Sequence, residues 1–146
     1  MKHKILHKKE KAQSMVEFAL FYLILLVLLS GVIDLGRAFF AFMALRDAAQ
    51  EGATYASLYP ADTSGAGNGM EQRVRNSSTN PVDFSNPDIT VQAFPLGALC
   101  HGSGIRIEVE WPNFPLLFPY WQIFTGINTI SLHAQVTDTI LRPPCE

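Results

Sequence analysis

The stretch that decides the fold is residues 13–33, which read QSMVEFALFYLILLVLLSGVI. Its central part, residues 18–33, contains no charged side chain. A helix needs about 20 mainly apolar residues to cross the hydrocarbon of a bilayer. Apolar neighbours lengthen the run at both ends, so the sequence predicts a spanning helix over about residues 15–36.

The charges on either side of this run are strongly asymmetric. All five lysines precede it: Lys2, Lys4, Lys8, Lys9 and Lys11. Flanking lysines stay on the cytoplasmic side, so the N-terminus is predicted to lie inside and the remainder of the chain outside. Lysines also suit the anionic inner leaflet, so the lipid bilayer is a predicted partner. Residues 13–146 carry six arginines against twelve acidic residues. A negative external part argues against nucleic acid as a partner.

A cleaved secretory signal is the alternative interpretation of the apolar run. Such a signal has a short core followed by a cleavage site between small residues. Here residues 34–41 read DLGRAFFA, which continues a helix and offers no clear site of that kind. Asp34 and Arg37 are three residues apart and share a helix face, so we expect them to form an ion pair near the outer membrane interface.

The helical pattern continues beyond the predicted membrane segment. Apolar residues recur at spacings of three and four up to residue 56, beside a second stripe of small residues. Small residues let another backbone approach closely, although alanine also simply favours a helix. The residue before a proline avoids helical geometry, so the helix is predicted from about residue 14 to 58, ending before Pro60.

The period then changes from helical spacing to two. Apolar and polar residues alternate over residues 89–93, 105–111 and 130–137, which is typical of strands with one buried face. Three such strands would form an antiparallel sheet, and the outer half of the long helix would cover it. The predicted fold class is α+β: a long N-terminal helix, half of it transmembrane, packed on a small three-stranded antiparallel sheet.

A segment rich in proline and aromatic residues separates the last two predicted strands. It covers residues 112–124 and is too apolar and too broken by proline to be predicted as a strand. It either tucks under the edge of the sheet or forms an exposed apolar patch. As a patch it would make the chain a membrane-anchored extracytoplasmic binding module. The candidate recognition residues are Phe114, Phe118, Tyr120 and Trp121.

No constellation of catalytic, metal-binding or cofactor-binding residues is found. His133 and Asp138 lie on one predicted strand but five residues apart, so they point to opposite faces without a nucleophile beside them. We therefore predict neither an enzyme nor a cofactor.

Cys100 and Cys145 are both in the external part, where an oxidising compartment favours a disulfide. Two unrelated thiols are the alternative.

Glu17 is the exception inside the apolar segment. A carboxylate in hydrocarbon is costly unless it is paired, so such residues are usually functional. A basic leader followed by an apolar helix whose fifth mature residue is Glu resembles the layout of type IV prepilins. The cleavage site would then lie between Ala12 and Gln13. The freed amine of Gln13 could pair with Glu17 of a neighbouring subunit; alternatively, Glu17 lies at headgroup level and does little.

Three sequence motifs together resemble the TadE-like family, pilin-like proteins of tight-adherence (Tad/Flp) pilus systems, and with a looser C-terminal likeness the resemblance covers about residues 13–142. They are QSMVEFAL at residues 13–20, GVIDLGRAF at 31–39 and AAQEGATYA at 48–56. The family usually has glycine before the cleavage site, whereas this chain has Ala12.

The resemblance implies a minor pilin or pseudopilin that acts in pilus assembly, with roles in surface adhesion and secretion. Implied partners are other pilins, pilus-assembly membrane proteins and a prepilin peptidase. The implied location is the bacterial cytoplasmic membrane, with incorporation into the pilus. The expected parts are a basic cytoplasmic leader (1–12), a transmembrane helix (13–36), its extramembrane continuation (37–59) and an external α+β pilin-like domain (60–146).

Overall fold

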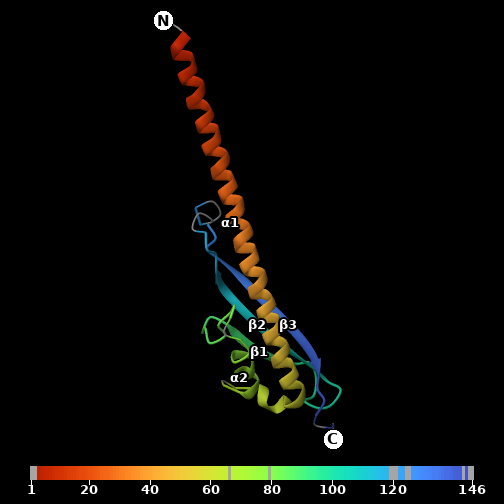
Figure 1. The fold of residues 1–146 in the computed structure, drawn as a ribbon. Coiled ribbons are helices and arrows are strands. Elements are labelled where there is room, and N and C mark those ends of the chain that lie inside the picture. The colour runs from red at the N-terminus through yellow and green to blue at the C-terminus, as the bar shows by residue number, and fades with distance from the viewer. Residues whose placement is uncertain are drawn as a thin grey trace. The chain divides into compact units, whose positions relative to one another are not determined.

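The computed structural model describes residues 3–65, 67–78, 80–118, 122–123, 126–142 and 144, and for residues 3–12 it describes the backbone alone. The elements, in chain order, are α1 (His3–Leu58), η1 (Pro60–Thr63), α2 (Gly69–Arg75), β1 (Thr90–Pro95), β2 (Gly104–Pro115) and β3 (Thr129–Thr139) (Figure 1). The chain divides into two compact units, Met1–Gly36 and Arg37–Glu146. We call them the N-terminal unit and, after the location predicted for it from the sequence, the external unit.

The N-terminal unit is one continuous helical segment. α1 begins at His3, so the prediction that the helix starts at about residue 14 was wrong. Residues 3–12 contain neither glycine nor proline and are rich in lysine, a good helix former, so nothing in this stretch interrupts the helix. The predicted end was right, because α1 stops at Leu58, two residues before Pro60.

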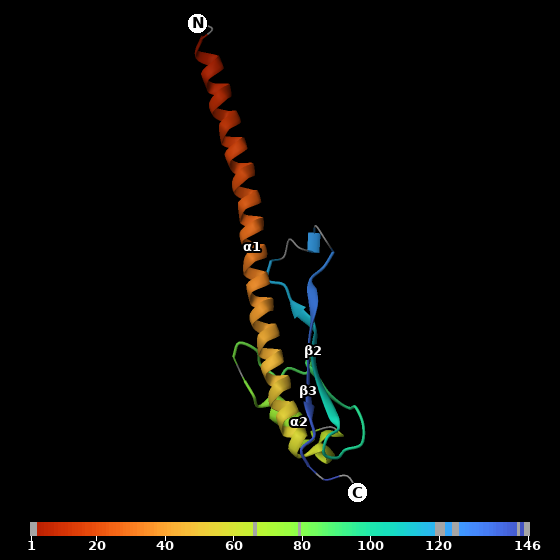
Figure 2. The same ribbon diagram turned by 90° about the vertical axis from the view of Figure 1, so that its right-hand side faces the viewer.

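The external unit has two layers. The three strands form one antiparallel sheet in the order β1-β2-β3, as the alternation predicted. The outer half of α1 lies along this sheet, and α2 lies near the C-terminal end of α1 (Figure 2). The α+β architecture predicted from the sequence, a long apolar helix packed on a three-stranded antiparallel sheet, is therefore confirmed.

The core of the external unit lies between the two layers. Small residues of α1 face the sheet, and the alternating residues Ile105, Ile107 and Val109 of β2 face the helix. α2 and the loop after it add three large buried side chains, Met70, Val74 and Phe84. The stripe of small residues on α1 thus lets the helix approach the sheet closely within the same chain.

β2 is longer than the sequence predicted. Residues 112–115 were expected to lie outside any strand, but β2 continues through Pro112 to Pro115, with a register shift between Trp111 and Phe114. The ladder with β1 ends at the pair Thr90 and Glu110. Beyond that point β2 has a neighbour on one side only, where a proline costs no ladder hydrogen bond, and the bulge turns Phe114 into the core.

Candidate functional site

The predicted processing junction lies within the first third of α1. Gln13 and Glu17 are one helical turn apart, and the Gln13 side-chain amide Nε2 donates to Glu17 Oε1 over 3.3 Å. Both side chains are exposed, as are the apolar residues around them. Ala12 is part of the same helix. The geometry places the carboxylate and the residue that would become the new N-terminus on one face of the helix.

The apolar run after Glu17 has a surface that the chain itself does not cover. Within Gln13–Leu58, the most apolar window has a mean hydropathy of 2.5, and none of that window is buried. The largest side chains from Met15 to Ile33 are all exposed. By length and composition this helix can cross a membrane, and its surface is consistent with membrane anchoring.

Asp34 and Arg37 mark the end of the apolar run. Asp34 is only 4% exposed, although it is a carboxylate. Arg37 Nη1 donates to the carbonyl oxygen of Pro115 over 3.4 Å, and its guanidinium carbon lies 5.3 Å from the centre of the Phe114 ring. The ion pair predicted between Asp34 and Arg37 stays a prediction. The contacts of Arg37 with β2 could not be read from the sequence.

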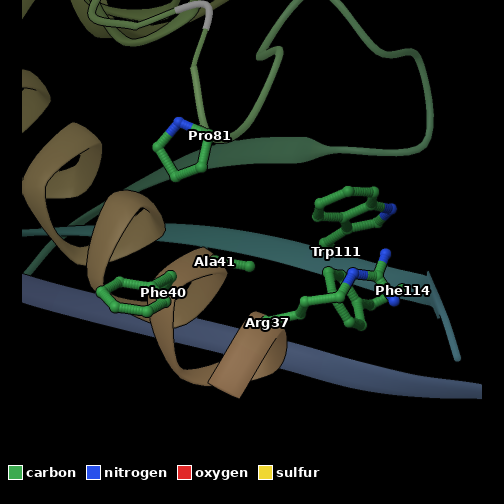
Figure 3. Close-up of a pocket in the computed structure, with 6 residues that line it drawn as sticks. All are labelled: Arg37, Phe40, Ala41, Pro81, Trp111 and Phe114. Atoms are coloured by element: carbon green, nitrogen blue, oxygen red, sulfur yellow. The ribbon is translucent and has the colours of Figure 1, made fainter. Parts of the chain in front are cut away.

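A pocket of about 320 Å³ surrounds this arginine. Figure 3 shows the Arg37 side chain reaching from α1 toward Phe114 and Trp111 of β2, with Pro81 on the opposite side. The pocket is lined by Arg37, Phe40, Ala41, Pro81, Trp111 and Phe114. Trp111 meets Phe114 edge to face at 5.0 Å, and its buried Nε1 has no hydrogen-bond partner among the described residues. Sequence reasoning missed this pocket, because local patterns do not show where the loop carrying Pro81 lies.

The candidate recognition residues do not share one environment. Phe114 is buried in the core. Phe118 is partly buried, in the connection between β2 and β3. Tyr120 and Trp121 lie outside the described residues. The recognition role given to this set stays a prediction, and the buried side chain of Phe114 does not contribute to an exposed surface.

The face of the sheet turned away from α1 is polar. Glu108 lies near the centre of this face, with its carboxylate 3.6 Å from His133 Nε2 and 3.8 Å from Arg106 Nη1. These groups are partly solvent-exposed, so the contacts between them contribute little to stability. Among the described residues, no group of three histidine, cysteine or acidic side chains could hold a metal ion.

A second polar cluster joins the end of α1 to α2. The Tyr55 hydroxyl donates to Asp62 Oδ2 over 2.8 Å, and the backbone N–H of Gly69 donates to Asp62 Oδ1 over 3.1 Å. The Gly69 N–H, and then the Tyr55 hydroxyl, lower the pKa of Asp62 below its ordinary value, because both donors favour the charged carboxylate. The same hydrogen bond raises the pKa of Tyr55. This arrangement is structural, since it connects two helices.

Of the two cysteines in the predicted disulfide, the structure describes Cys100. Cys100 is partly buried in the connection between β1 and β2. Cys145 lies outside the described residues, so the predicted disulfide stays a prediction. The end of β3 is held to this connection by two backbone hydrogen bonds, Gly102 N–H to Ile140 O (2.9 Å) and Ile140 N–H to Ser103 O (2.8 Å).

Comparison with known proteins bears on the N-terminal part of the chain. No curated protein and no solved structure matches the chain significantly. One protein family, described as TadE-like protein, matches the stretch that includes the predicted processing junction, the apolar run and most of α1 beyond it. TadE-like proteins are pilin-like, are associated with the Tad pilus and are not enzymes in general. The resemblance seen in the sequence motifs is therefore confirmed for residues 12–54, which match the TadE-like family.

Proposed function

We propose that this chain is a minor pilin or pseudopilin that acts in the assembly of a Tad/Flp-type pilus, with roles in surface adhesion and secretion. The observation that carries the proposal is the TadE-like match over residues 12–54. This match starts at the predicted processing junction and covers the exposed apolar helix. In this proposal the chain is anchored in the bacterial cytoplasmic membrane, with its N-terminus inside and the external unit outside.

Processing would begin the assembly step. A prepilin peptidase would cleave between Ala12 and Gln13, which removes the lysine-rich leader and leaves a free amine on Gln13. Gln13 and Glu17 are one helical turn apart in α1, so that amine would lie near the carboxylate. The mature helix would then carry an amine and a carboxylate close together at its cytoplasmic end.

The carboxylate would favour association over isolation in lipid. An ionised acid in an apolar environment is costly unless an opposite charge and hydrogen bonds compensate it. The Gln13 amine of a neighbouring pilin can supply both. The exposed apolar side chains after Glu17 could then exchange lipid contacts for helix contacts, so other pilins and pilus-assembly membrane proteins are the proposed partners.

Cleavage is tested by mass spectrometry of the protein purified from its native host. We expect a mature N-terminus at Gln13. Ala12→Gly should increase the cleaved fraction, because glycine is the usual family residue before the cleavage site, whereas Ala12→Leu should reduce it. A protein that retains Met1 in assembled pili would overturn the processing step.

The role of Glu17 is tested by Glu17→Gln, which removes the charge and keeps the shape. We expect normal membrane insertion and strongly reduced piliation, counted by electron microscopy. A matched control, the double variant Val16→Glu with Glu17→Val, keeps one carboxylate but moves it around the helix, and it should assemble as poorly. Piliation of Glu17→Gln at the wild-type level would show that the carboxylate is not used.

A further inference from the structure

We propose that the exposed residues Leu117, Ile123 and Ile127, which lie between β2 and β3, form a second membrane contact in the outer interfacial layer of the bilayer. The occupant of this surface is lipid: headgroups and the first carbons of the acyl chains. The inference rests on the membrane anchor of the proposed function, but it needs neither cleavage nor pilus assembly. We call the contact surface the hairpin tip and define it by the exposed residues Leu117, Ile123 and Ile127.

The stretch that contains the hairpin tip is mainly apolar and uncharged. No charged residue or histidine occurs from residue 112 to residue 128. Leu117 is 66% exposed, Ile123 is 73% exposed and Ile127 is 50% exposed. Tryptophan and tyrosine are enriched at membrane interfaces, and the stretch contains one of each, Tyr120 and Trp121, by sequence alone. A surface of this composition is poorly suited to water and well suited to the interfacial layer.

Contacts within the external unit place the tip at the membrane end of that unit. Arg37 begins the external unit and directly follows the predicted spanning segment. It donates to the carbonyl of Pro115, the last residue of β2, and its guanidinium lies over Phe114. The last ladder pair of the hairpin, Pro115 and Thr129, therefore lies beside the residue at which the chain leaves the bilayer.

Another hydrogen bond places the opposite end of the sheet beside the C-terminal end of α1. The backbone N–H of Leu141, two residues after β3, donates to the carbonyl of Ser57 near the end of α1 over 2.8 Å. β2 therefore runs from the Ser57 end of α1 toward Arg37. Figure 1 shows the same arrangement, with the end of β2 and the start of β3 at the end of the sheet away from α2.

Exposure alone would not distinguish the two ends. The β1–β2 connection, at the Ser57 end, also exposes apolar side chains, with Leu96 at 52% and Leu99 at 41%. That connection contains His101 and has no aromatic residue between residues 96 and 103. Position and composition, rather than exposure, thus assign the lipid contact to the hairpin tip, and Leu96 is a natural control.

The backbone of the connection is suited to holding the tip in place. The ladder is extended by a hydrogen bond from Leu116 N–H to Asn128 O (3.0 Å), and Gly126 N–H donates to Gln122 O (3.0 Å). Gly126 has a φ of 72°, which glycine adopts without steric cost.

The test uses the full chain in its native membrane. The photoreactive residue p-benzoylphenylalanine is introduced at Leu117, at Leu96 or at Ile24, and the products of irradiation are identified by mass spectrometry. Ile24 lies in the apolar run and reports on the anchor itself. We expect phospholipid adducts at residue 24 and at residue 117, with at least a fivefold lower yield at residue 96.

Each other outcome overturns the proposal and says which part has failed. A lipid adduct at residue 24 without one at residue 117 would refute the second contact and leave the anchor intact. Adducts to protein at residue 117 would show a subunit contact instead of lipid. Equal lipid yields at residues 96 and 117 would show that the tip has no special position, and no lipid adduct at residue 24 would refute the anchor on which the inference rests.

Discussion

Gly52 shows how tightly α1 packs in the external unit. A Cβ atom at this position would lie 2.6 Å from Val74 Cγ2 of α2 and 3.4 Å from Ile107 Cγ2 of β2. The first distance is too short, and Val74 and Ile107 are themselves fully buried. The absence of a side chain at Gly52 thus lets the helix, α2 and the sheet meet, although glycine costs about 1 kcal/mol of helix propensity.

We therefore expect Gly52→Ala to destabilise the protein. Overpacking costs about 1–3 kcal/mol, which exceeds the gain of up to about 1 kcal/mol in helix propensity. Thermal unfolding in detergent, followed by circular dichroism, should show a lower Tm. Gly36→Ala is the matched control, because a Cβ there has nothing within 4 Å and should leave the Tm unchanged or slightly raised.

The clash has a specific second test. Val74→Ala removes the Cγ2 atom that a Cβ at residue 52 would meet. If that contact causes the loss, then Gly52→Ala should destabilise the Val74→Ala background much less than it destabilises the wild type. Equal losses in the two backgrounds would place the cause elsewhere.

Asp62 gives the external unit a dependence on acid pH. Its pKa in the folded state is lowered from 3.8 by the Gly69 N–H and the Tyr55 hydroxyl. A lowered carboxyl pKa contributes stability that is present above pH 3.8 and is lost as the pH falls through the folded-state value. The free energy of unfolding should thus decrease below about pH 4, in line with the ordinary pKa of aspartate.

Chemical denaturation at pH 6 and at pH 3 measures this effect. Asp62→Asn should lower the stability at pH 6 and make the difference between the two pH values smaller. Asp47→Asn, which changes an exposed carboxylate on α1, is the matched control and should keep the wild-type difference. An unchanged pH difference in Asp62→Asn would assign the acid sensitivity to other groups.

At the scale of the element, the local pattern was enough to find the three strands that the described residues form. Alternation located β1, β2 and β3 to within a few residues, because each has one face on the core and one in water. The continuation of β2 through Pro112 was missed, because the alternation stops at Trp111. A proline is tolerated in a strand where no neighbouring strand needs its missing N–H donor. In β2 this depends on where β1 ends, which the alternation in β2 does not show.

The candidate site, like the strands, could be predicted from the sequence only in part. The sequence indicated the roles proposed for Glu17 and Gln13, because both depend on spacing along one helix. It could not show that Arg37 contacts Pro115 and Phe114, which are far along the chain. The small-residue stripe on α1 was visible, but the sequence did not tell whether the approaching backbone belongs to a neighbour or to the chain's own sheet.

The predicted disulfide would tie the C-terminal tail to the β1–β2 connection. Ile140 is already hydrogen-bonded to Gly102 and Ser103 in that connection, so the tail that carries Cys145 starts close to Cys100. Closing a loop of this length by a disulfide stabilises a protein by roughly 2–4 kcal/mol. We expect Cys145→Ser to lower the stability by about that amount under oxidising conditions.

Reductant supplies the control for this prediction. In excess dithiothreitol the wild type and Cys145→Ser should unfold at nearly the same denaturant concentration. Mass spectrometry without reduction should find neither thiol open to alkylation in the wild type. Alkylation of both cysteines in the folded, unreduced protein would show two separate thiols.

At the scale of the whole molecule, the two units differ in whether their apolar side chains are exposed or buried. The N-terminal unit exposes its large apolar side chains, whereas the hydrophobic core runs from Ala38 to Ile140 and thus lies wholly in the external unit. The apolar segment of residues 13–36 contributes no side chain to that core. Its exposed surface is suited to lipid or to other helices, in keeping with an anchor that also serves in assembly.

This division predicts that residues 37–146 fold without the N-terminal unit. They contain all the buried hydrophobic residues of the core, the whole sheet and the contacts of Arg37. Produced in an oxidising compartment, the truncated chain should unfold cooperatively on heating, as followed by circular dichroism. A shorter chain that begins at Ala53 loses Leu45, Ala48 and Ala49 from the core and should be unfolded. If residues 37–146 also fail to unfold cooperatively, the prediction is wrong and the external unit depends on the N-terminal unit for its structure.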